Sequence, residues 1–215
     1  MSHAVWMLLY AIERADREAY LDWFHRVHIP DKLARPGYTW AAHYAVTSAA
    51  GSSEPGGYVA LFGGESTRVF HDPSPAQLKL RQDADTRRMM GMRRAGSGTI
   101  LCEAWRDGRL DAAVAAPAIR LHCIDAGGAD EDLEAWLAQE RVPTLLAGAG
   151  CSGVRKWLGA SGAVRHAVVE EYASLAACAG ADDRAPPTDW SARVAAAVRE
   201  PVGPPRVATR IWPAA

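Results

Sequence analysis

The chain has 215 residues, of which 49% are hydrophobic and 23% charged, a composition typical of globular proteins. Its formal net charge of -1 gives no overall field that would attract nucleic acid or an acidic membrane surface. The sequence has neither a basic, cleavable leader nor the roughly 18 uncharged apolar residues in a row that a membrane span needs. The four cysteines lack paired spacing, so neither disulfides nor zinc are expected, and the sequence predicts a reduced cytoplasmic protein.

The first predicted elements are a strand and a helix. The apolar run over residues 5–12 is too short for a normal helix and predicts a strand. Large apolar residues with the spacing of one buried helical face follow at Tyr20, Trp23, Phe24 and Val27. Because proline disfavours helical geometry in the residue before it, Pro30 predicts that this helix ends near His28.

The rest of the first half predicts two strands, a second helix and a last strand. Aromatic-rich residues 38–46 and apolar residues 58–62 predict the strands, with a Gly- and Ser-rich hairpin loop between them. Residues 74–92 predict the helix, and a run ending at Trp105 predicts the closing strand. The arginine pairs at 87–88 and 93–94 are interpreted as the solvated face of that helix.

The second half of the chain repeats this order. Ungapped alignment of residues 23–44 with 136–157 pairs identical residues: Trp23 with Trp136, Pro30 with Pro143, Leu33 with Leu146 and Gly37 with Gly150. Matching order over the whole length indicates an internal repeat. The sequence therefore predicts two units, residues 1–110 and 118–215, joined by an Ala-rich linker over 111–117.

A βαββαβ order is that of the ferredoxin-like fold, in which helices cover one face of an antiparallel sheet. Two such sheets can bury their bare faces against each other. The predicted fold class is therefore α+β, with two tandem ferredoxin-like units packed into an α+β barrel. Pairing of the units within one chain makes a monomer sufficient, and a homodimer stays compatible with the sequence.

The segment WFHRVHIPDKLARPGY, residues 23–38, resembles the EthD-like and related stress-responsive domains of the dimeric α+β-barrel superfamily. The resemblance implies a small pocket between sheet and helices in each unit. That superfamily includes cofactor-independent oxygenases, lactone isomerases, polyketide cyclases and haem-degrading enzymes. Its recurrent histidine corresponds to His28 here, whereas the second unit has Arg141 in the same column.

His28 is the candidate catalytic residue. At a helix C-terminus the helix dipole favours the cationic form of a histidine. Beside the apolar stripe, a neutral imidazole could take a proton from a substrate. The alternative is a structural histidine that caps the helix or pairs with Asp31. A metal site with His25 is not expected, because His25 points largely away from the stripe.

Four aromatic residues are candidate ligand-binding residues: Trp6, Tyr10, Trp40 and Tyr44. Strand alternation puts Trp6 and Tyr10 on one face of the first strand, and Trp40 and Tyr44 on one face of the second. A cluster of these rings would suit a flat apolar ligand, with the tyrosine hydroxyls to orient it. The alternative is ordinary core packing.

In the second unit, Glu140 stands where the first unit has Val27, an apolar stripe position. An unpaired buried carboxylate would be costly, so a polar pocket is a candidate there, with partners that include His122, Arg141 and Arg155. A helix end that lets Glu140 reach water is the alternative.

These features predict an enzyme without a resident cofactor, of oxygenase, isomerase or cyclase type, that acts on a small apolar or aromatic metabolite. One alternative is a non-catalytic module that binds a small ligand or is purely structural. Another is haem binding or degradation, with His28 or His71 as the iron ligand.

Overall fold

The computed structural model describes residues 3–47, 55–108, 115–148, 150–179 and 188–213. Strands of this described part form a closed antiparallel barrel in the order β1-β3-β2-β8-β5-β7-β6-β4. The strands are β1 (Ala4–Ile12), β2 (Tyr38–Val46), β3 (Gly57–Gly64), β4 (Arg93–Gly108), β5 (Ala118–Ile124), β6 (Cys151–Ser161), β7 (His166–Tyr172) and β8 (Arg206–Trp212).

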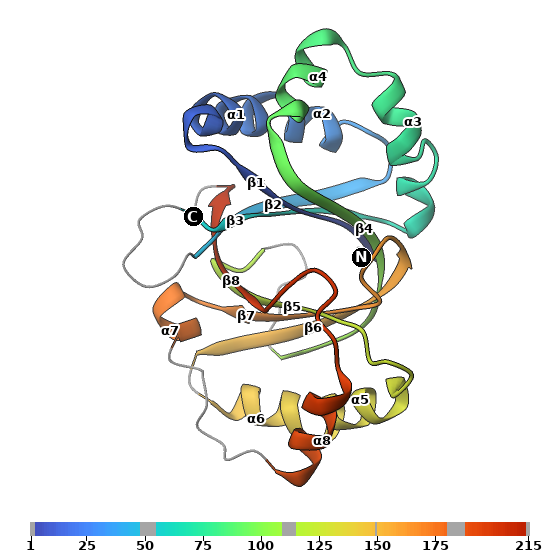
Figure 1. Ribbon diagram of the computed structural model, residues 1–215, viewed down its shortest axis with the longest axis vertical. Helices are drawn as coiled ribbons and strands as arrows, with labels where there is room; N and C mark the ends of the chain where they lie inside the picture. The colour runs from blue at the N-terminus through green and yellow to red at the C-terminus, as the bar shows by residue number, and fades with distance from the viewer. Residues whose placement is uncertain (1–2, 48–54, 109–114, 149, 180–187, 214–215) are drawn as a thin grey trace.

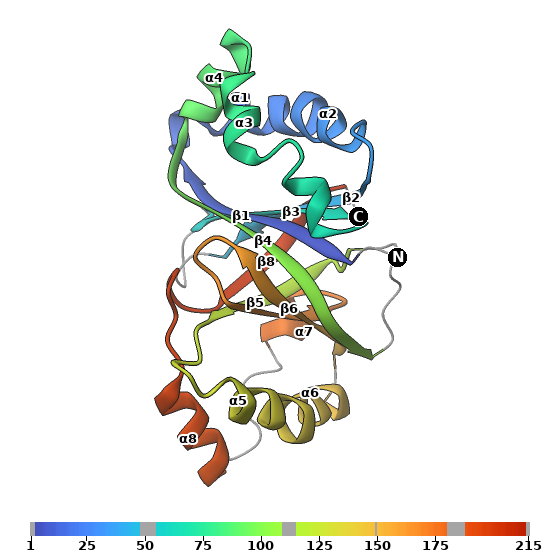
Figure 2. The same cartoon turned by 90° about the vertical axis from the view of Figure 1, so that its right-hand side faces the viewer.

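Helices lie outside the barrel, mainly on two opposite sides (Figures 1 and 2). One side carries α1 (Arg17–Trp23), α2 (Ile29–Leu33), α3 (Pro75–Leu80) and α4 (Ala84–Gly91). The other carries α5 (Asp130–Trp136), α6 (Val142–Ala147) and α8 (Asp189–Ala197), while α7 (Leu175–Ala179) contacts β5, β7 and β8. Among the described residues, no helix combines the length and apolarity that crossing a bilayer requires.

The barrel closes within the single chain. The first four strands are ordered β4-β1-β3-β2 and the last four β8-β5-β7-β6. Pairing of β2 with β8 and of β4 with β6 joins the two sheets. The prediction of an α+β barrel is confirmed. Most of the expected 111–117 linker and of the expected hairpin loop at 51–57 lies outside the described residues.

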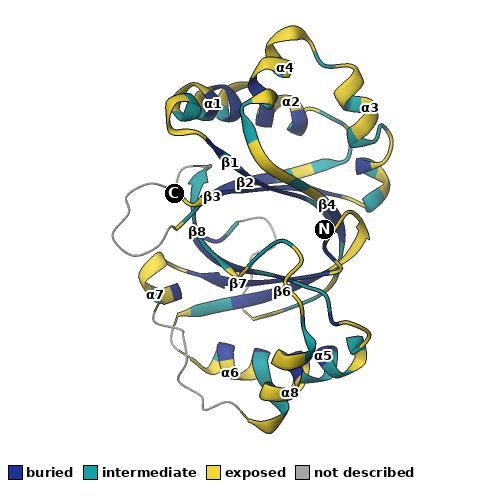
Figure 3. Cartoon of the chain, in the orientation of Figure 1, coloured by how far each residue is buried: buried dark blue, intermediate teal, exposed yellow. Residues whose placement is uncertain are grey.

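Alternation along β1 separates two cores. Val5, Met7 and Leu9 point into the barrel interior, whereas Leu8 and Tyr10 pack under the helices of the first half. Since successive side chains of a strand point to opposite faces, a strand with both faces covered is apolar throughout. Figure 3 shows the consequence, with the barrel strands largely buried and the outer helix faces exposed.

The helix after β1 does not end at His28. Residues Phe24–His28 form a π-helical turn and α2 then continues to Leu33, with Pro30 in its first turn. A π turn re-spaces the backbone hydrogen bonds, so the missing proline N–H costs no regular helical bond there. The second half repeats the feature, with a π turn over Leu137–Arg141 followed by Pro143 in α6.

The π turn also alters the buried stripe. Tyr20 and Phe24 are fully buried as predicted, but Val27 is 44% exposed. The inserted residue rotates the following positions around the helix axis, so His28 takes the inward place instead. The prediction of Val27 as a core residue is therefore wrong.

The single helix predicted over 74–92 is two short helices, α3 and α4, separated by an extended turn. Ser74 caps α3 in a capping box with Gln77, and the Asp83 carboxylate accepts the backbone N–H of Thr86 at the start of α4. An internal N-cap interrupts a helix because its backbone is extended. The two segments form the outer wall of the cavity described below.

Gly159 in β6 leaves no room for a side chain. A Cβ at this position would lie 2.2 Å from the Val164 carbonyl oxygen, and Gly159 N–H donates to the Arg165 carbonyl. We expect Gly159→Ala to destabilise the fold by about 1–3 kcal/mol, since the tight β6–β7 connection must shift. Urea unfolding measures this, with Gly96→Ala as control because no atom lies within 4 Å of its added Cβ. Equal stability of the two variants would contradict the packing described.

Candidate functional site

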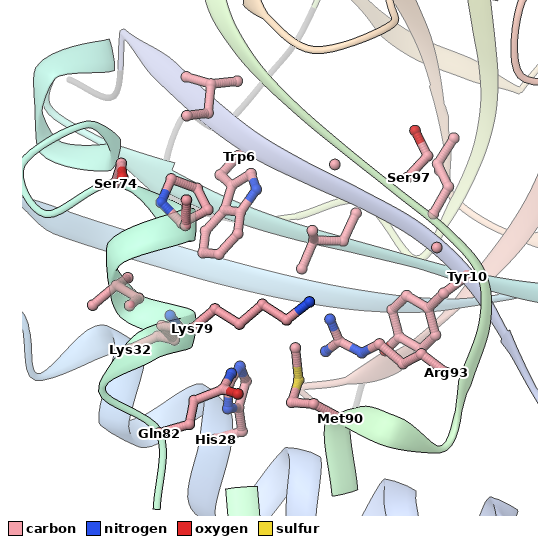
Figure 4. Close-up of a pocket in the computed structure, with 18 of the residues that line it drawn as sticks. Trp6, Tyr10, His28, Lys32, Ser74, Lys79, Gln82, Met90, Arg93 and Ser97 are labelled. Carbon is pink, nitrogen blue, oxygen red and sulfur yellow. The ribbon is translucent and has the colours of Figure 1, made fainter. Parts of the chain in front are cut away.

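A cavity of about 910 Å³ lies between the sheet and the helices of the first half (Figure 4). Its walls come from β1, β4, α2, α3 and α4, and Ser161 of β6 reaches it from the second half. Where Ser161 reaches the cavity, its Oγ lies 3.2 Å from His71 Nε2. The volume is within the range of small-molecule sites, which are mostly apolar with a few polar groups.

His28 lines this cavity, as the resemblance implies, but its environment differs from the prediction. The side chain is only 8% exposed and lies against the rings of Trp23 and Phe24, with centroids 4.8 Å and 5.3 Å away. Burial lowers the pKa of His28 to about 2, and the charges of Lys32, Arg93 and Arg35 act in the same direction. The expected rise from a helix C-terminus is absent because the helix continues past His28. The imidazole is therefore neutral, but too weak a base to hold a proton.

Lys32 is the most unusual group in the cavity. It is one helical turn after His28, is 6% exposed, and has its ammonium 4.9 Å from the centroid of the Trp6 ring. Within the described part of the chain, no carboxylate forms a salt bridge with this ammonium. Burial lowers the pKa of Lys32 to about 7; the charges of Arg35 and Arg93 add to this, and Asp31 opposes it. Lys32 therefore exchanges a proton near neutral pH.

Arg93 brings a second cation to the same cavity from the start of β4. Its guanidinium lies 4.4 Å from the centroid of the Tyr10 ring (Figure 4). Its Nε donates to Tyr20 Oη at 2.6 Å. Its Nη2 is buried without a hydrogen-bond partner among the described residues. The prediction of a solvated arginine pair at 93–94 is thus half wrong, because strand alternation turns Arg93 inward and leaves Arg94 exposed.

The four predicted aromatic residues do not form one cluster. Trp6 and Tyr10 line the cavity, whereas Tyr44 lies in the barrel interior, where its hydroxyl donates to the Ala116 carbonyl. Trp40 packs against that interior core. The face of β1 that carries Trp6 and Tyr10 points to the helices, whereas the face of β2 that carries Trp40 and Tyr44 points into the barrel. Alternation within one strand does not show which of its faces points to the helices.

A hydrogen-bonded chain runs from the cavity wall toward the surface. Tyr10 Oη lies 2.9 Å from His43 Nε2, and His43 Nδ1 lies 2.8 Å from His25 Nε2. Burial holds the pKa of His43 well below its usual value, so the ring is neutral. If Tyr10 donates to His43, then His43 Nδ1–H can donate to the half-buried His25. This chain could pass a proton between the cavity wall and solvent.

The corresponding region of the second half holds an ion cluster centred on Glu170, which is 1% exposed. Arg141 Nη2 donates to Glu170 Oε1 at 2.8 Å, His122 Nε2 lies 3.3 Å from the same oxygen, and Tyr172 Oη donates to Oε2 at 2.7 Å. Burial alone would raise the pKa of Glu170, but the hydrogen bond from His122 and the neighbouring positive charges lower it to about 2. Arg120 Nη1 lies 3.7 Å from Glu170 Oε2, so this buried carboxylate faces two guanidinium groups.

Glu140 does not belong to that cluster. It accepts hydrogen bonds from Thr188, Ser191 and Trp136 near the start of α8. The predicted partners bind elsewhere: Arg141 and His122 contact Glu170, and Arg155 pairs with Glu171 at 2.8 Å. Of the two interpretations of Glu140, the structure fits the one in which its carboxylate reaches water, because the π turn that exposes Val27 also turns Glu140 outward.

No group of three or more His, Cys, Asp or Glu side chains within the described ranges is arranged to hold a metal ion. His25 is bonded to His43, as stated above, and does not converge with His28 on one point. The candidate site residues that the sequence analysis missed are Lys32, His43 and Arg93. Lys32 lies four residues after His28, and residues four apart share one face of a helix. A helix predicted to continue through Pro30 would therefore have placed Lys32 beside His28.

No family model matches the sequence, and no curated protein is similar to it in sequence. The structure is similar to an anthrone oxidase-like protein with a TM-score of 0.70 at 12% identity, covering 98% of this chain and 92% of that one. A monooxygenase-like protein of Fusobacterium nucleatum gives 0.58 at 6% identity, with coverages of 98% and 93%. A chlorite dismutase-like protein gives 0.56 at 15% identity, with coverages of 98% and 96%. The chain thus has the α+β-barrel fold of these proteins.

Proposed function

We propose that the chain is an oxygenase-type enzyme without a resident cofactor, and that it acts on an aromatic carbon acid bound in the first-half cavity. The observation that carries this is Lys32, an amine with a pKa near 7 inside an aromatic-walled cavity. A general base is most effective when its pKa lies near the working pH. The fold likeness to an anthrone oxidase-like protein suggests the substrate type.

In this proposal the neutral amine of Lys32 removes a proton from a C–H bond that the aromatic ring acidifies. Arg93 stabilises the negative charge that develops on the substrate, because a fixed cation in a dry site costs no reorganisation. The carbon then transfers electrons to dioxygen and a C–O bond forms. The resulting peroxide anion takes up the proton from Lys32. Its O–O bond then breaks as the second hydrogen of the same carbon is lost, which releases water and leaves a ketone, so oxygen and substrate are consumed in equal amounts.

His28 is proposed to orient the substrate rather than to act as the base. The neutral ring faces the cavity beside Lys32 and can donate or accept a hydrogen bond. Tyr10, with its contacts to His43 and Arg93, is proposed to carry protons toward His25.

The direct test is oxygen uptake with anthrone as substrate, in the presence of a metal chelator. We expect conversion to the quinone with equal consumption of oxygen, a loss of kcat of about 100-fold or more in Lys32→Met, and unchanged turnover in Arg88→Gln. Arg88 is a suitable control because it is exposed and paired with Asp85 at 2.7 Å, outside the cavity. Full turnover by Lys32→Met would remove the lysine from the reaction, and ligand binding without oxygen uptake would favour a non-catalytic binding module.

We further propose that the chain is a tandem duplication of a ferredoxin-like unit of the EthD-like, stress-responsive kind, with the unit boundaries given above. The strand orders of the two halves and the π turn followed by proline in each half support this. In the alignment of the two units, Lys32 corresponds to Leu145 of the second unit. Only the first unit would therefore carry this lysine site.

Haem chemistry has less support in the residues present. His71 uses Nδ1 toward the Thr67 carbonyl and Nε2 toward Ser161, and His28 packs on two aromatic rings beside two cations. Neither imidazole is arranged as a ligand for iron, so no step through haem is derived.

A further inference from the structure

The charge of the first-half cavity is one-sided. Lys32 and Arg93 line it from the inside, and the exposed Lys79 and Arg87 line its rim. Among the described residues that line the cavity there is no aspartate or glutamate. The remaining walls are apolar, aromatic or neutral polar, so nothing in the lining neutralises the two inner cations.

One buried and one half-buried cation without an anion are unfavourable in the empty protein. Charges removed from water usually have a partner of opposite sign, as Arg141 has in Glu170 in the second half. Lys32 has instead the face of Trp6, and the Nη2 of Arg93 has no acceptor within the described ranges. A ligand with one negative charge would supply the missing counter-ion.

The walls determine what else the ligand must have. Trp6 and Tyr10 provide flat rings, and Leu8, Met90 and Ile100 provide aliphatic surface. The anion must therefore be attached to an apolar, ring-sized body. Inorganic anions would meet the charge but would leave most of the apolar wall uncovered.

We propose that the cavity binds aromatic monoanions, with the negatively charged oxygen group held between Lys32 and Arg93. This inference rests on the proposed function in treating the cavity as the substrate site, and it names the substrate class. A carboxylate or an acidic phenol on an aromatic ring meets the requirement. Lys79 and Arg87 at the rim attract such an anion toward the opening.

The inference is consistent with the role of Lys32 as a base. A neutral substrate that gives its proton to the neutral amine produces the same state as an anion that binds to the ammonium. In both cases a substrate anion lies beside a protonated Lys32 and the guanidinium of Arg93. The site therefore favours the charged form of its ligand whichever way that form arises.

The test compares 2-naphthoate with its neutral analogue 2-naphthamide by isothermal titration calorimetry. We expect naphthoate to bind about 10- to 100-fold more tightly, since hydrogen bonds to charged groups contribute that much. Lys32→Met, which retains the volume of the side chain, should remove most of this preference, and Arg88→Gln should retain all of it. Arg93→Gln should reduce it as well, although loss of its bond to Tyr20 makes the lysine variant the decisive one.

The outcomes separate the two proposals. Equal affinity for naphthoate and naphthamide, unchanged in Lys32→Met, would overturn the anion preference and leave the cavity as a site for neutral aromatic molecules. Failure of both probes to bind would overturn the aromatic site itself and the inference with it.

Discussion

Glu170→Gln should destabilise the protein by about 3–5 kcal/mol, the usual effect of breaking a buried ion pair by removing one partner. The glutamine keeps the shape of the side chain but removes the negative charge at the centre of the second-half cluster. Arg141 and His122 then lose the carboxylate that lies 2.8 Å and 3.3 Å from them. Urea unfolding measures the change, and Glu131→Gln, an exposed acid of α5, is the control that should stay within about 0.5 kcal/mol of the unmodified chain.

The same substitution has a defined pH dependence. The folded pKa of Glu170 is about 2, below its ordinary value of 4.5, so its stabilising contribution is complete above about pH 4.5. That contribution is lost as the pH falls from about 4.5 to about 2. The stability gap between the unmodified chain and Glu170→Gln should therefore close over this window. A gap that is small at pH 7 would contradict the ion cluster.

Lys32→Met should act in the opposite direction and stabilise the empty protein by about 1–4 kcal/mol. Methionine fills a similar volume against Trp6 but brings no charge into the apolar cavity. The folded pKa of Lys32, about 7, is below its ordinary value of 10.5, so the protonated form is disfavoured in the folded state. The advantage of the variant is thus full below about pH 7 and shrinks as the pH rises toward 10.5.

Thermal unfolding at pH 6 and pH 10 measures this difference. Lys79→Met is the matched control, because Lys79 is an exposed lysine at the rim of the same cavity and should change stability by less than about 0.5 kcal/mol. Stability and function are opposed at Lys32, since the substitution that stabilises the empty fold should abolish the site. Destabilisation of both lysine variants to the same extent would contradict the account of Lys32.

Most strands were predictable because they contain a short apolar run with turn residues beside it. β4 is the exception, because it extends over Arg93–Gly108, well beyond the apolar run that ends at Trp105. Residues 38–46 were predicted as a strand from their aromatic content, and β2 has the same bounds. The helix after β1 was less predictable. A proline usually ends a helix, and nothing local to Pro30 distinguishes a helix end from a π turn that lets the helix continue.

That one difference accounts for most of what the sequence missed at the site. Ending the helix at His28 removed Lys32 from consideration and gave His28 a helix dipole that it does not have. It also made Val27 and Glu140 inward positions, although the π turn rotates both outward. His43 and Arg93 were missed for a different reason, because which face of a strand meets the helices depends on the pairing of the whole barrel.

The most direct test of the cavity as a functional site is a pH titration of the Lys32 side chain by carbon-13 NMR of isotopically labelled lysine. The chain has only three lysines, Lys32, Lys79 and Lys156, so Lys32→Met identifies the signal. We predict a midpoint near pH 7 in the empty protein and a clear rise when 2-naphthoate is bound, because the anion stabilises the ammonium. A midpoint near 10.5 that does not change with naphthoate would contradict both the buried, unneutralised lysine and the site built around it.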